Sequence, residues 1–191
     1  AGGLSVGIGF GMQTIVNNFL SGLILIFSRT LHEGDVIDVG NLQGVVRKIS
    51  VRATTVETFD NAIIFVPNSE FVSNRLINWT RNGRIVRREV AIGVAYGTDP
   101  KLVERLLVEV AQSVPQIVRR PQPFVLFMDF ADSTLNFVLR YWSDIGTATD
   151  AASAIRHRIV EVFAEHQVEI AFPQLDVHVI PQTPSLTRAE G

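Results

Sequence analysis

The stretch that decides the fold lies at the start of the chain, where residues 1–28 read AGGLSVGIGFGMQTIVNNFLSGLILIFS. It contains no charged side chain, and the first charge is Arg29. A helix of this length extends about 40 Å, whereas the hydrocarbon core of a bilayer is about 30 Å thick. The pattern therefore predicts a membrane-spanning helix over residues 1–30, with a lower half that is amphipathic and bent.

On a helical wheel at about 100° per residue, this helix has four different sides. One side is large and apolar, formed by Leu4, Ile8, Met12, Ile15 and Phe19. The opposite side starts apolar and turns polar, formed by Val6, Phe10, Gln13 and Asn17. The two flanks between them are small, formed by Gly3, Gly7 and Gly11 on one and by Ser5 and Gly9 on the other. Small flanks allow helices to approach closely.

A closed ring of identical helices needs two such flanks, because each subunit meets its two neighbours through different faces. The fourth side would then face a central axis. Val6 and Phe10 would form apolar constrictions, which can gate a pore by dewetting, and Gln13 and Asn17 would be polar pore-lining residues. Two other interpretations are a helix bundle with a simple glycine seam and a glycine-rich phosphate loop. The second lacks the dinucleotide spacing and a preceding strand. Asn18, beside Asn17, and Gly22 are the positions where we expect the helix to bend.

Beyond residue 30 the sequence predicts two further domains and an α+β fold. Residues 31–82 contain short β-branched strands with turn signals between them, which indicates a small β-barrel resembling the Sm fold. We expect these strands over residues 35–39, 44–50, 51–58, 62–66 and 75–80. Residues 83–180 follow the strand, helix, strand, strand, helix, strand order of a ferredoxin-like αβ domain. Its elements are expected over residues 85–96, 99–114, 124–130, 134–142, 150–166 and 175–180, followed by a C-terminal tail over residues 181–191.

Composition argues against several kinds of site. The formal net charge of -2 disfavours nucleic-acid binding through bulk positive charge, and the absence of cysteine excludes disulfides. The four histidines lack metal-ligand spacing with a carboxylate, so neither a metal nor a cofactor is expected. Asp129 and Asp132 flank a turn that favours Asp for turn chemistry rather than catalysis. We therefore expect no enzyme. A basic cluster near residue 82 fits a solvated face or salt bridges between subunits, with ion attraction toward a pore entrance as the alternative; it comprises Arg81, Arg84, Arg87 and Arg88.

Several short motifs stand in a set order along the chain. The first two are Gly7-Ile-Gly-Phe-Gly-Met-Gln13 and Asn18-Phe-Leu-Ser-Gly22; they are followed by Glu33-Gly34-Asp35, Ile64-Phe65-Val66-Pro67-Asn68, Asn78-Trp79, Gly93-Val94-Ala95-Tyr96 and Phe172-Pro173-Gln174. Together they resemble the pore helix, β domain and αβ domain of the MscS family of small-conductance mechanosensitive ion channels. The stretches Leu4-Ser5-Val6-Gly7 and Arg52-Ala53-Thr54-Thr55 are more similar to the larger, MscK-like members.

This resemblance implies a homoheptamer in the cell inner membrane, with the residues after about 30 in the cytoplasm. It implies a pore that membrane tension opens to release ions and small solutes on osmotic downshock, with membrane lipids as further partners. Val6 and Phe10 match the family's constricting residues, Asn18 matches a family asparagine near the helix bend, and Gly22 matches a glycine of the lower pore helix. Thr14 stands where the family usually has a kink glycine, and Phe10 stands where small members commonly have Leu.

Two alternatives remain open from the sequence. The first is a soluble, ring-forming Sm-like assembly or RNA-binding module, against which the uncharged first stretch and the near-neutral charge both count. The second is an enzyme built on the ferredoxin-like half, for which no site chemistry is visible.

Overall fold

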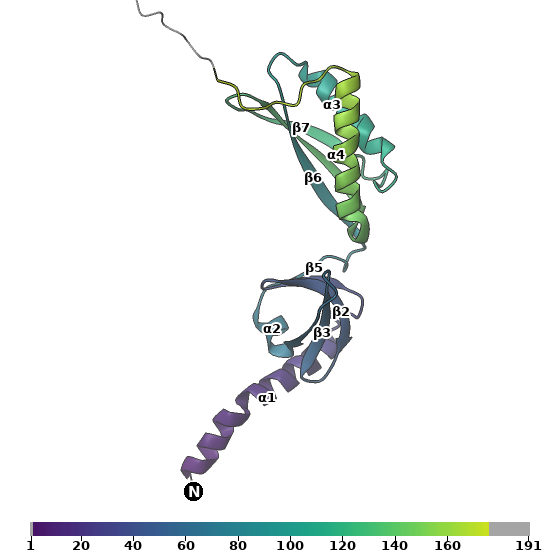
Figure 1. Cartoon of the computed structure of the whole chain (residues 1–191). Coiled ribbons are helices and arrows are strands. Elements are labelled where there is room, and N and C mark those ends of the chain that lie inside the picture. The colour runs from purple at the N-terminus through teal and green to yellow at the C-terminus, as the bar shows by residue number, and fades with distance from the viewer. Residues whose placement is uncertain (1, 176–191) are drawn as a thin grey trace, which may run out of the picture. The chain divides into compact units, whose positions relative to one another are not determined.

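The structure is a computed structural model that describes residues 2–175, with side chains from residue 8 onward. The chain forms two compact units (Figure 1). The first comprises Ala1–Arg88, Gln116–Val118 and Trp142–Ala151, and the second comprises the remaining segments. The tail predicted over residues 181–191, and the strand predicted over residues 175–180 apart from Leu175, lie outside the described residues.

The first element is a single helix, α1 (Gly2–Ser28), which is 27 residues long. It is followed by a five-stranded antiparallel sheet in the order β4-β3-β2-β1-β5, which is strongly curled (Figure 1). The strands are β1 (Val36–Val39), β2 (Leu42–Ile49), β3 (Ala53–Thr58), β4 (Ile63–Pro67) and β5 (Leu76–Asn78). All five lie within a few residues of their expected bounds.

One short helix in this β domain, α2 (Asn68–Ser73), was not predicted. The sequence signal for it was the Pro67-Asn68 pair, because proline is well tolerated at the start of a helix and cannot continue a strand ladder. Helix α2 contributes Phe71 to the core of the domain. The other core side chains come from alternate strand positions and from the chain around α1; the buried members are Leu25, Leu31, Ile37, Val39, Val46, Val56 and Val66. Alternation of this kind is expected for a sheet with one buried face.

Helix α1 is seated on the β domain through the side of its C-terminal half that carries Ser21, Gly22 and Leu25, all of which are buried. The contact at Gly22 is so close that a Cβ atom there would collide with the carbonyl oxygen of Val51 and the side-chain amide of Asn68. Glycine is therefore required at this point for the helix to approach the domain.

A second, three-stranded sheet has the order β6-β8-β7, formed by β6 (Ile85–Val94), β7 (Phe124–Phe130) and β8 (Leu135–Asp144). Most of it belongs to the second unit, whereas the start of β6, the end of β8 and residues 145–151 belong to the first. Helices α3 (Pro100–Ser113) and α4 (Ala148–Glu165) accompany it, and the short 3-10 turn η1 (Ile145–Thr147) precedes α4. Helix α4 buries one side, formed by Ile155, Ile159, Val162 and Phe163. In α3, Leu102 is half-buried, while Val103, Leu106, Leu107 and Val110 are buried. An α+β fold with these elements confirms the predicted fold class.

We predict that Gly22→Ala destabilises the chain by about 1–3 kcal/mol, the usual cost of forcing extra atoms into a packed contact. The carbonyl of Val51 cannot rotate away as a flexible side chain would. The thermal midpoint of the purified protein measures the effect. Gly93→Ala is the matched control, because its added Cβ would lie at an ordinary contact distance of 3.4 Å from Thr134. Equal midpoints for the two variants would contradict the prediction.

Candidate pore helix

The upper part of α1 is exposed and apolar. Residues Ile8–Ser28 are long and apolar enough to cross a membrane, with a mean hydropathy of 1.5, and only 17% of that window is buried. This part of the helix projects away from the β domain (Figure 1). A core helix of a soluble protein would be covered by its own chain, so the exposed surface here requires lipid or other helices as a partner.

The predicted pore face is brought together on one side of α1. Phe10, Gln13 and Asn17 line a single shallow groove along the helix, and Phe10 is 73% exposed. The other residues of this groove are Gly9, Met12, Val16 and Leu20. Val6 lies one turn before Phe10, but its side chain is outside those that the structure describes. The groove therefore carries one aromatic side chain and two amides on an exposed side of α1, together with Met12, which the wheel placed on the opposite side.

The predicted flanks are open where their surroundings are described. An added Cβ atom at Gly9 or at Gly11 would meet nothing within 4 Å. Gly3 and Gly7 lie in the part of α1 whose side chains are outside the described residues. The open surface at Gly9 and Gly11 leaves room for a neighbouring helix to approach closely.

The helix continues without interruption past both expected bend positions, Asn18 and Gly22. Asn18 instead links α1 to α2. Its amide nitrogen donates to the carbonyl oxygen of Thr14 at 3.0 Å, and its oxygen accepts a hydrogen bond from the backbone N–H of Ser69 at 3.0 Å. The first N–H groups of any helix lack a partner within the helix, and Asn18 satisfies one of those of α2.

Asn68, beside Ser69, ends one of the motifs noted in the sequence, but its contact with α1 was not predicted. It is fully buried, and each part of its amide has a partner. Its nitrogen donates to the carbonyl oxygen of Ser50 at 2.8 Å, and its oxygen accepts from the hydroxyl of Thr54 at 2.8 Å. A fully satisfied buried amide is rigid. Asn68 therefore gives Gly22 a rigid packing partner.

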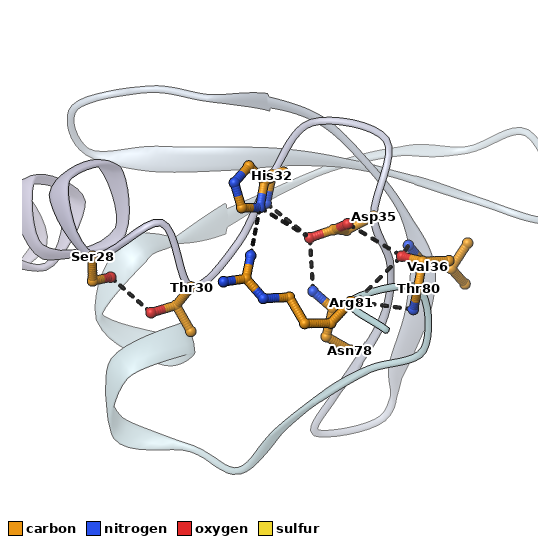
Figure 2. Close-up of polar contacts among 8 residues, drawn as sticks. All are labelled: Ser28, Thr30, His32, Asp35, Val36, Asn78, Thr80 and Arg81. Atoms are coloured by element: carbon orange, nitrogen blue, oxygen red, sulfur yellow. Dashed lines mark hydrogen bonds and ion pairs between the residues drawn. The ribbon is translucent and has the colours of Figure 1, made fainter. Parts of the chain in front are cut away.

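A second polar cluster joins the chain after α1 to the chain after β5 (Figure 2). The carboxylate of Asp35 accepts hydrogen bonds from the backbone N–H of His32 at 2.9 Å, from the amide of Asn78 at 2.7 Å and from the hydroxyl of Thr80 at 3.2 Å. The same hydroxyl accepts from the backbone N–H of Val36 at 3.0 Å. These bonds explain why Asp35 and Asn78 occur in the motifs noted in the sequence.

The basic cluster is largely engaged in local contacts. Arg84 forms a two-point ion pair with Asp144, with a Nε–Oδ2 distance of 3.0 Å, and its hydrogen bonds together with the backbone N–H of Gly146 lower the pKa of Asp144. Arg88 lies over the ring of Trp79 at 5.8 Å from the centroid. Arg84 and Arg88 thus have partners within the chain, and salt bridges between subunits stay a prediction. Asp129 lies in β7, opposite Asn136 of β8, and its carboxylate accepts a hydrogen bond from the backbone N–H of Phe130 at 2.8 Å.

Comparison with known proteins follows the two parts of the fold. Residues 14–81 match the family model described as mechanosensitive ion channel, beta-domain, and residues 89–170 match that described as mechanosensitive ion channel MscS, C-terminal. The closed-state crystal structure of Helicobacter pylori MscS matches with a TM-score of 0.86 at 26% identity, covering 95% of this chain and 72% of that one.

Curated relatives include an MscS family protein of Haemophilus influenzae, 45% identical over 177 residues, and the mechanosensitive channel MscK of Escherichia coli, 39% identical over 180 residues. These alignments cover 92% and 94% of this chain but only 16% of either relative. The small-conductance mechanosensitive channel of Edwardsiella ictaluri is 31% identical, over 94% of this chain and 62% of that protein. Two models of this family match successive parts of the chain, a solved MscS structure matches its fold, and the curated relatives carry names of the same family. The chain therefore belongs to the MscS family of mechanosensitive ion channels.

Proposed function

We propose that this chain supplies the pore-lining helix and the cytoplasmic domains of a mechanosensitive channel subunit in the inner membrane. The observation that carries the proposal is the division of α1 into two halves. The half around Gly22 is packed on the β domain, while Phe10, Gln13 and Asn17 lie on an open face of the other half. A helix that is packed on its own domain at one end and exposed at the other is suited to line a pore formed with further copies of the same chain.

In the proposed ring, the side chains at Val6 and Phe10 form the closed barrier. An apolar constriction excludes water and hence ions until it widens. Membrane tension favours the packing with the larger in-plane area, so opening is a shift of population between two arrangements of the helices. The small flanks at Gly9 and Gly11 let neighbouring helices slide between these arrangements. Ions and small solutes would then pass on osmotic downshock, through a homoheptamer surrounded by membrane lipids.

The two contacts of α1 with the β domain would transmit this movement. Asn18 is bonded to the start of α2, and Gly22 rests on Asn68 one turn later. The lower half of α1 is thus held while the upper half moves. Because the helix is held from Asn18 onward, we place the bend that accompanies gating at the Asn17-Asn18 pair, where the held part begins, rather than at Thr14, since β-branched threonine is a poorer hinge than glycine.

The central experiment is Phe10→Ser in the full-length protein, recorded in membrane patches. Each substitution removes apolar surface whose burial is worth about 2 kcal/mol per subunit. The pore should hydrate more easily, so the channel should open at lower tension or leak at rest. Phe10→Leu is the matched control, because it keeps the ring apolar and should leave a closed resting channel. An unchanged threshold in Phe10→Ser would contradict the assignment of this face to the pore.

The contact between α1 and α2 is tested by comparing two adjacent asparagines. Asn18→Ala leaves the N–H of Ser69 without its acceptor and should cost about 1 kcal/mol of stability, as the loss of a helix-capping group does. Asn17→Ala changes an exposed amide in the groove and should leave the thermal midpoint unchanged. In patch recordings Asn18→Ala should also alter the tension threshold. Loss of stability in both variants to the same extent would argue against a specific link at Asn18.

The native mass of the purified chain in detergent tests the ring. A closed heptamer gives seven times the 21.1 kDa of one chain, before bound detergent is counted. The small flanks predict this closed assembly, because each subunit needs two neighbours. Multi-angle light scattering measures the protein mass separately from the detergent. A monomer or dimer, found also for the full-length protein, would contradict the ring.

A further inference from the structure

His32 and Arg81 meet where the chain leaving α1 passes the chain leaving β5 (Figure 2). The guanidinium nitrogen Nη1 of Arg81 lies 3.0 Å from Nδ1 of His32. An arginine side chain has only donors, so Nδ1 must be the acceptor of this hydrogen bond. The imidazole in this contact is therefore neutral and carries its proton on Nε2.

A carboxylate also lies near the same ring nitrogen. The Oδ2 atom of Asp35 lies 3.8 Å from Nδ1 of His32. That oxygen already accepts hydrogen bonds from the backbone N–H of His32 and from the amide of Asn78, so its position is fixed. The side chain of His32 is 49% exposed and can exchange protons with water, whereas that of Asp35 is only 13% exposed.

Two further charged residues, Arg29 and Glu33, line the same surface hollow as His32. The carboxylate of Glu33 accepts a hydrogen bond from the backbone N–H of Ile49 at 3.4 Å. Carboxylates and guanidinium groups ordinarily keep their charge between about pH 5.5 and 7.5, while imidazole is the side chain that changes charge in this range.

We propose that His32 is a positioning residue whose charge decides whether the base of the pore helix is tied to the segment that follows β5. Neutral His32 accepts the hydrogen bond from Arg81. Protonation places a hydrogen on Nδ1, which ends that bond and sets two cations against each other. The protonated ring then donates to Asp35, which belongs to its own loop, and Arg81 is released.

The effect of this contact on gating rests on the proposed channel function, whereas the contact itself does not. The bond between His32 and Arg81 is present in a conformation that matches a closed-state channel structure. A bond made in one state stabilises that state relative to states without it. Acidification of the side that bears these residues should therefore lower the tension needed to open the channel.

The contact itself is tested by a double-mutant cycle on the purified chain in detergent, with His32→Gln, Arg81→Gln and the double variant. At about pH 7.5 the two single variants should lower the thermal midpoint non-additively, which reports a favourable coupling. At about pH 5.5 the coupling should vanish or change sign. A coupling that is the same at both pH values would overturn the proposal, because a purely structural contact would not depend on the charge of the ring. His157→Gln, on the exposed surface of α4, is the matched control and should show no coupling to Arg81→Gln at either pH.

The consequence for gating is tested in excised patches of the full-length protein at the same two pH values. The wild-type threshold should fall at the lower pH, and His32→Gln should remove that shift while His157→Gln keeps it. An equal shift in wild type and His32→Gln, or no shift in wild type, would overturn the gating role. Absence of any tension-activated current would instead contradict the proposed channel function, and the double-mutant cycle would still decide whether the contact depends on protonation.

Discussion

The structure depends on the close approach of α1 to the β domain at Gly22. The absence of a side chain there lets the helix rest on the carbonyl of Val51 and on the amide of Asn68. Because Asn68 is buried and bonded to Ser50 and Thr54, this support cannot yield easily. Leu25, one turn further along, enters the core of the domain. Rigid support of the lower helix leaves the upper helix as the part that is free to respond to its surroundings.

The upper half of α1, by contrast, exposes an apolar surface that its own chain does not cover. Ile8, Phe10 and Ile15 are each more than half exposed, and no charged side chain occurs before Arg29. Such a surface is unfavourable in water and stable only against lipid or other apolar helices. Glycines within it weaken an isolated helix by about 1 kcal/mol each relative to alanine. That cost is offset when neighbouring helices pack closely over Gly9 and Gly11, so the helix and the assembly are expected to stabilise each other.

The features that the sequence predicted correctly are those that depend on local periodicity. The uncharged run predicted the long helix α1, and alternation along the strands located the β domain, whereas the pore face assigned to Phe10, Gln13 and Asn17 stays a prediction. Features that depend on distant partners were missed. Nothing local in the sequence around Asn68 shows that it lies under Gly22, because that contact joins segments far apart in the chain. For Asn18 the sequence predicted a bend, whereas the structure shows a hydrogen bond to Ser69 across 51 positions. The short helix α2 was not predicted because its six residues are too few to show a helical period in the sequence.

Helix α1 and the chain that follows it are held by two chemically different kinds of contact. At Gly22 the contact is buried and steric, so pH and salt have little influence on it. Around His32 and Asp35 the contacts are polar and partly exposed, and their strength depends on the charge of one imidazole. A mechanical link that must persist through many cycles of movement is suited to the first kind. Adjustment of the resting state by solution conditions requires the second, because only a contact that water can reach responds to the composition of that water.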